Sequence, residues 1–204
     1  MRTKIIIIGA VVLTFVAFEY FKLHKKKTPA TTQARLVSVY QAPFWSVIES
    51  SKASSHSYEE QCKVLEQLLI EKNFDIVQFD KDFRKVMNDA YTYKLWGAAY
   101  LINGGCSDDC FYDFRAWLVS QGEEFYKSVI KDPDILADAK IPQEDYWAGL
   151  QFAADNAYFK KSGKHIPVIT DASATQPSGQ KWEEEELPAL LPKLAKKYAG
   201  QMDE

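Results

Sequence analysis

The sequence has little cysteine, little histidine and no excess of positive charge. Its 3 cysteines are an odd number, which does not indicate a framework of disulfides. None of its 3 histidines lies beside Cys106 in the sequence, so no Cys–His catalytic pair is indicated. Acidic residues number 28 against 25 basic ones, and binding to phosphates needs a clustered positive surface. We therefore expect no nucleic acid among the partners.

Strand patterns and internal repeats are also missing. No stretch of useful length alternates apolar and polar residues, and no repeat period is visible. Apolar residues instead recur three and four positions apart, as on the buried face of a helix, most clearly from Ile76 to Ala90. Hydrophobic residues make up 47% of the 204 residues, enough for one sizeable core. The prediction is an all-α fold, a single helical domain preceded by one N-terminal transmembrane helix.

The transmembrane helix is predicted from Ile5 to Leu23. This stretch is almost uninterruptedly apolar up to Phe18, and as a helix it would span about 28 Å, close to the thickness of a bilayer core. A cleaved signal peptide is the alternative. The bulky and charged residues from Phe18 to Lys22 do not resemble a cleavage site, so an uncleaved membrane anchor is preferred.

Charges beside this stretch predict its orientation. Two basic residues precede the apolar run that ends at Phe18 and four follow it closely: Arg2 and Lys4, then Lys22, Lys25, Lys26 and Lys27. The bias favours a single-pass protein with its C-terminal domain in the cytoplasm, where cysteines should be reduced. If that placement is wrong, Cys106 and Cys110 are the first candidates for a disulfide.

The chain divides into four predicted parts. Residues 1–27 form the membrane anchor with its basic flank, and residues 28–42 form a polar linker. A helical domain covers residues 43–162, and residues 163–204 form an irregular segment and a C-terminal helical tail limited by Pro188 and Pro192. Within the domain, Pro43 begins the first helix, Ser57 begins another with a capping box, and a late helix covers Gln143 to Lys161.

One polar loop, Asn103 to Asp109, stands out between apolar helices. Its glycines permit positive φ, and Ser107 followed by Asp108 and Asp109 is typical of a helix N-cap with an acidic first turn. The preferred interpretation is therefore structural. The functional alternative places Asp108, Asp109 and Asp113 around a cation or a basic group, but these supply only part of the oxygen ligands of a hard cation. We expect no metal and no cofactor.

Arg115 follows the loop within an aromatic helix. Its guanidinium could pair with a carboxylate such as Asp108, which is the preferred interpretation, or it could bind a ligand carboxylate or phosphate. Cys106 could act as a nucleophile only with a lowered pKa and a nearby base. No catalytic residue is assigned. The candidate ligand- or partner-binding residues are Asn103, Cys106, Ser107, Asp108, Asp109 and Arg115.

The string LWGAAYLINGGCSDDCFYDFRAWLVSQG, from Leu95 to Gly122, resembles the signature of the domain of unknown function 4240 family, which is largely bacterial. The resemblance extends to an opening Phe44-Trp45 helix and an Asp132-Pro133 stop, and covers about residues 43–159. Cys110 departs from the pattern, because glycine is expected there, and the predicted anchor is an addition. The resemblance implies a shared fold and surface and no particular reaction.

These observations favour a binding or interaction module held at the membrane. The loop from Asn103 to Asp109 would recognise a protein or a small polar ligand. The alternative is a hydrolase in which Asp108 or Asp109 acts as general base and Arg115 as an electrostatic clamp. Whether the protein is an enzyme stays open at this point.

Overall fold

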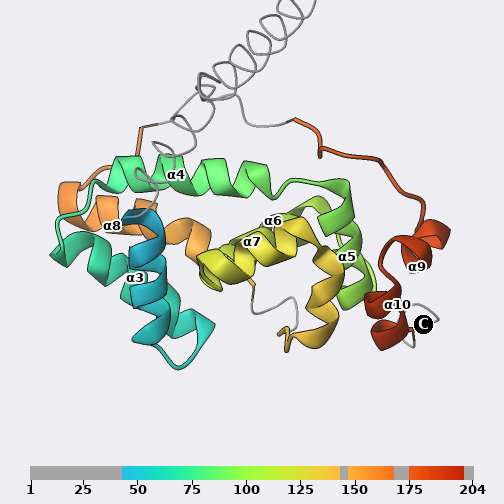
Figure 1. Ribbon diagram of the computed structural model, residues 1–204. Coiled ribbons are helices and arrows are strands. Elements are labelled where there is room, and N and C mark those ends of the chain that lie inside the picture. The colour runs from blue at the N-terminus through green and yellow to red at the C-terminus, as the bar shows by residue number, and fades with distance from the viewer. Residues whose placement is uncertain (1–42, 143–146, 168–174, 200–204) are drawn as a thin grey trace, which may run out of the picture. The chain divides into compact units, whose positions relative to one another are not determined.

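The computed structural model in Figure 1 describes residues 43–142, 147–167 and 175–199. All of them belong to one compact unit, Gln41–Glu204. The predicted anchor from Ile5 to Leu23 and the linker over residues 28–42 lie outside the described residues. Among the residues that are described, no helix is both long and apolar enough to cross a bilayer.

The all-α prediction is confirmed for the described residues, which contain no strand beyond an isolated bridge between Thr92 and Ser178. A first helix covers residues 43–53 and starts at Pro43 as predicted. The α-helices that follow are α3 (Tyr58–Glu71), α4 (Ile76–Asp89), α5 (Tyr93–Asn103), α6 (Asp108–Ser120), α7 (Glu123–Lys131), α8 (Ala153–Ser162), α9 (Leu187–Leu190) and α10 (Pro192–Tyr198). The 3₁₀ helices within the described residues are η1 (Pro133–Asp138), η3 (Leu150–Phe152) and η4 (Glu184–Glu186).

The helices pack around one hydrophobic core. Helices α3 and α8 contact each other at one end of the domain, and α5 contacts α9 and α10 at the other (Figure 1). Helix α4 contacts both α8 and α6. The largest fully buried side chains include Trp147, Phe44, Phe111 and Phe114. The Phe44-Trp45 helix and the loop-flanking helices α5 and α6 therefore share the same core.

Polar side chains begin several of these helices. Ser57 Oγ accepts a hydrogen bond from the backbone N–H of Glu60 at 3.1 Å, which is the predicted N-cap. The second half of the predicted capping box differs, because the Glu60 carboxylate accepts from the N–H of His56 at 2.7 Å and not from that of Ser57. Thr92 begins α5 in the same way as Ser57, accepting from Leu95 at 3.2 Å.

The late helix is shorter than the sequence predicts. Regular α-helix starts only at Ala153, after the 3₁₀ turn η3, and part of the predicted range lies outside the described residues. Gly149 has φ 144°, and a Cβ there would lie 2.8 Å from Cys62 Sγ on α3. Both the positive φ and the close approach favour glycine at this position, and that φ is incompatible with an α-helix. Trp147 is fully buried at a turn and does not belong to the helix that the sequence predicts.

The C-terminal tail packs into the core of the domain. Leu187, Leu191 and Leu194 are all fully buried, and the proline positions limit helices α9 and α10 as predicted. The buried carboxylate of Asp134 in η1 accepts hydrogen bonds from the backbone N–H groups of Lys193 at 3.1 Å and Leu194 at 3.0 Å. A side chain of the domain thus caps the N-terminus of α10.

Candidate functional site

The Asn103–Asp109 loop is built as a helix stop followed by a helix start. Gly104 adopts a left-handed conformation with φ 67° and ends α5. Asn103 Nδ2 donates to Gly105 O at 3.0 Å, and Ser107 Oγ accepts from Cys110 N–H at 3.2 Å as the N-cap of α6. Both side chains make bonds within the loop and the first turn of α6. The structural interpretation of these two residues therefore agrees with the geometry.

Cys106 also has a structural task. Its carbonyl accepts a 2.9 Å bond from the Trp96 indole, which stacks on Phe111 with the ring centroids 5.2 Å apart. Its sulfur forms a disulfide with Cys110. The expectation that these two cysteines are reduced is therefore wrong, and Cys106 is not available as a nucleophile. The residue that departs from the family pattern, Cys110, is the one that closes the bridge.

The other three candidate residues line one groove between α4 and α6, which we call the α4–α6 groove. Its volume is about 330 Å³. Helix α6 contributes the exposed carboxylates of Asp108 and Asp109 together with Arg115. The described residues around them are Phe83, Arg84, Met87, Asn88, Tyr91 and Tyr112. The fold thus separates the six candidates into three that hold the loop and three that face a groove.

Arg115 is 7% exposed, and its environment differs from the preferred prediction. Its Nη1 donates to the carbonyl of Met87 at 2.7 Å and its Nε to that of Phe111 at 3.3 Å. The guanidinium carbon lies 4.4 Å from the centre of the Tyr91 ring. Among the described residues no carboxylate forms an ion pair with it. The predicted pairing with Asp108 is therefore replaced by a backbone carbonyl near the C-terminus of α4.

The charge of Arg115 is only partly compensated. Burial lowers its pKa, while the nearby tyrosines and Asp108 act in the opposite direction. Nη2 makes no hydrogen bond to any described residue. Among the described residues, every fully buried side-chain nitrogen or oxygen has a hydrogen-bond partner, so an atom without a partner must be accessible. Nη2 is therefore reachable from the α4–α6 groove. It offers two N–H donors to a ligand.

Beside Arg115, the same groove holds a second cation. Arg84 Nε pairs with Asp80 Oδ2 at 2.7 Å, and the Arg84 side chain is half exposed whereas that of Asp80 is buried. Asp113 interacts with a different element, because its carboxylate accepts a 2.6 Å hydrogen bond from the side-chain amide of Gln151 in η3. In the described part of the chain, no three potential metal ligands among His, Cys, Asp and Glu gather at one place.

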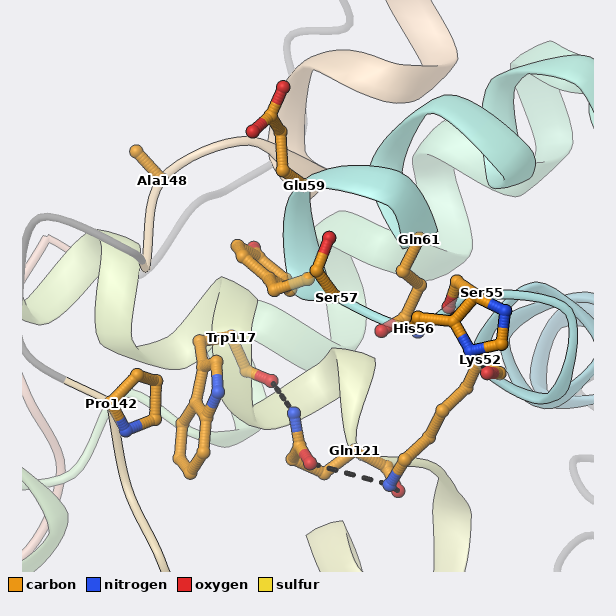
Figure 2. A pocket seen from close by; sticks show the side chains of 11 residues that line it. Lys52, Ser55, His56, Ser57, Glu59, Gln61, Trp117, Gln121, Pro142 and Ala148 are labelled. Carbon is orange, nitrogen blue, oxygen red and sulfur yellow. Dashed lines mark hydrogen bonds between the residues drawn. The ribbon is translucent and has the colours of Figure 1, made fainter.

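Sequence reasoning missed a larger cavity beside α3 and α6, lined among others by Gln61, Trp117 and Gln121 (Figure 2). A signal for it existed in α3. Gln61 stands four residues before Leu65 and eight before Leu69, so a polar side chain occupies the buried stripe of that helix. Its amide donates to Ser120 O at 2.9 Å, which ties α3 to the end of α6.

Comparison with known proteins finds no curated protein and no solved structure that matches the chain. A family model does match, over residues 40–160, and its description is protein of unknown function (DUF4240). The matched residues contain the loop, both cavities and helices α3 to α7. Because the match covers more than half of the chain, this protein belongs to the DUF4240 family.

Proposed function

We propose that this protein is a membrane-held binding module that takes a small zwitterionic ligand, about the size of an amino acid, in the α4–α6 groove. The observation that carries the proposal is the state of Arg115. It is nine-tenths buried, has no carboxylate partner among the described residues, and keeps Nη2 open to the groove. A buried cation without an anion favours the arrival of one.

The two signs of charge in the groove select a ligand that carries both. A ligand carboxylate would bind Arg115 at the floor, because a planar guanidinium suits a carboxylate. A ligand ammonium would lie toward Asp108 and Asp109, which are exposed on the first turn of α6. Tyr112 is 43% exposed at the same groove and offers an aromatic face to a cation.

The size of the groove fits this class of ligand. Sites for small molecules cover about 300–1,000 Å³, and the volume here, about 330 Å³, stands at the lower end. The hydrolase alternative, in which Asp108 or Asp109 acts as general base and Arg115 as an electrostatic clamp, uses residues of the same groove and stays an untested prediction.

The span from Ile5 to Leu23 supports the membrane part of the proposal, on its sequence alone. The flanking charges favour the cytoplasm, but they differ by only two between the two sides. The disulfide favours an oxidising compartment. We propose, in place of the cytoplasmic expectation, that the domain faces the oxidising side of the membrane.

The ligand proposal is tested on the full chain in mild detergent, by thermal unfolding in the presence of each of the twenty common L-amino acids. At least one should raise the unfolding midpoint, since a ligand at 100 times its Kd stabilises the folded state by about 2.7 kcal/mol. Its N-acetyl derivative, which lacks the ammonium group, should have a much smaller effect.

Two double variants separate groove binding from general charge effects. Asp108→Asn/Asp109→Asn removes two acids from the first turn of α6, and it should weaken binding at least tenfold. Glu123→Gln/Glu124→Gln removes two from the first turn of α7, which does not line the groove, and should leave affinity unchanged. Absence of stabilisation by every amino acid, or equal affinity in the first double variant, would overturn the proposal.

A further inference from the structure

The larger cavity, beside α3 and the C-terminal half of α6, has a volume of about 710 Å³, within the range of small-molecule sites. Lys52 and His56 come from the end of the first helix and the loop after it, and Trp117 and Gln121 from α6 and its end. Figure 2 shows these side chains around a common space, with Gln61 entering it from α3. None of these residues lines the α4–α6 groove.

Two deeply buried polar groups in this cavity have no partner. Trp117 is 3% exposed and Gln61 is 4% exposed. The described residues provide no acceptor for Trp117 Nε1–H and no donor for Gln61 Oε1, although the Gln61 amide nitrogen is bonded to Ser120 O. Every fully buried side-chain nitrogen or oxygen in the described part of the chain has a hydrogen-bond partner. These two atoms have none, so both are accessible from the cavity. Figure 2 shows both turned toward its interior.

Lys52 and Gln121, which line the same cavity, already bond to the protein. Lys52 Nζ donates to Gln121 O at 2.9 Å and to Gln121 Oε1 at 3.3 Å, and burial lowers the pKa of Lys52. The Gln121 amide nitrogen donates to Ser120 Oγ at 2.8 Å and to Trp117 O at 3.4 Å. Trp117 Nε1–H and Gln61 Oε1 are therefore a neutral donor and a neutral acceptor left for a ligand in the depth of the cavity.

We propose that this cavity binds a neutral ligand with a planar NH–C=O unit, such as a lactam. The ligand carbonyl would accept from Trp117 Nε1–H, and the ligand N–H would donate to Gln61 Oε1. Trp117 and Gln61 are both neutral, so the two suit a neutral group better than a charged one. The proposal is independent of the α4–α6 groove, since it uses different residues on a different side of α6.

The test follows the indole N–H resonances of the full chain, labelled with ¹⁵N-tryptophan in mild detergent. The chain has 5 tryptophans, and Trp117→Phe identifies the resonance of Trp117 by its loss. The probes are uracil and 2-pyrrolidinone, each paired with its N-methylated counterpart, 1,3-dimethyluracil or 1-methyl-2-pyrrolidinone. At least one N–H probe should shift the Trp117 resonance saturably, and its methylated counterpart should bind at least tenfold more weakly.

Trp182→Phe is the matched control, because Trp182 bonds to Tyr93 O and does not line the cavity. This variant should keep the saturable shift of Trp117 and so shows that loss of a tryptophan alone does not abolish binding. The Asp108→Asn/Asp109→Asn variant should keep it as well, which separates this site from the groove. A cavity that holds only water would give no saturable shift with any probe, and the proposal would then be wrong. Equal binding of N–H and N-methyl probes would also overturn it.

Discussion

Single residues in the loop divide into those that hold the backbone and those that face a ligand site. Ser107 bonds the N–H of Cys110, Asn103 bonds the carbonyl of Gly105, and Trp96 bonds the carbonyl of Cys106. Asp108 and Asp109 follow Ser107 and line the α4–α6 groove. The type of residue alone, polar and close to glycine, does not separate the two groups. Their partners do.

This division predicts different stabilities for neighbouring variants. Ser107→Ala removes the N-cap of α6 and should lower the free energy of unfolding by about 1 kcal/mol. Asp108→Asn and Asp109→Asn remove favourable interactions with the helix dipole and, for Asp108, with the charge of Arg115, so each should cost less than about 1 kcal/mol. Urea unfolding of the full chain in detergent measures both. A loss of about 1 kcal/mol or more in either aspartate variant would make these acids structural.

At the scale of elements, the contact between α3 and η3 depends on two partly buried neutral side chains, those of Tyr58 and Cys62. Tyr58 Oη accepts from Leu150 N–H at 3.2 Å, and Cys62 lies against Gly149. Burial raises the pKa of the Cys62 thiol to about 11 and raises that of Tyr58 as well. Both side chains are therefore neutral at physiological pH, so that neither introduces a charge into the contact between α3 and η3.

The pH dependence of the free energy of unfolding follows from these two raised pKa values. An acid whose pKa is higher in the folded state stabilises that state below its unfolded pKa, and this contribution disappears as pH rises through the folded value. For Cys62 the window runs from about 8.5, the ordinary thiol value, to about 11. We expect the free energy of unfolding to fall with pH in this window. The fall should be smaller in Cys62→Ala, and an identical slope in both proteins would contradict the assignment.

The docking of the tail depends on a single cap supplied by another element. Asp134 in η1 holds the first turn of α10 through Lys193 and Leu194. Asp134→Ala should cost about 1–2 kcal/mol, and the cost should appear as faster hydrogen exchange in residues 187–198. Asp138→Ala is a matched control, because Asp138 is an exposed acid of the same 3₁₀ helix. Equal exchange in the two variants would show that the cap does not hold the tail.

At the scale of the whole molecule, the state of the cysteines reports the compartment. The structure joins Cys106 to Cys110 and leaves Cys62 free. If the domain faces an oxidising compartment, a maleimide should label one thiol per chain in denatured protein taken directly from cells. After reduction it should label three. Three labelled thiols without reduction would place the domain in a reducing compartment, and a topology reporter after Glu204 would locate it independently.

Much of the architecture followed from the sequence by itself. Apolar spacing of three and four predicted the helices from Phe44 to Lys131, because one face of each must be buried against the others. Gly104 and Ser107 predicted where α5 stops and α6 starts, since glycine tolerates positive φ and serine accepts a backbone N–H. The family likeness also came from local order along the chain, in the string from Leu95 to Gly122.

Only the tertiary structure decided how the polar side chains are used. Arg115 was expected to pair with an acid on its own helix, but the nearest strong acceptor, the Met87 carbonyl, comes from α4 across the groove. Gln61 and Trp117 lie far apart in sequence and meet only because α3 packs against the end of α6. The spacing of residues along a helix determines which side chains lie on the same face. Which other element that face contacts depends on tertiary packing, and both candidate sites of this protein lie where two elements pack together.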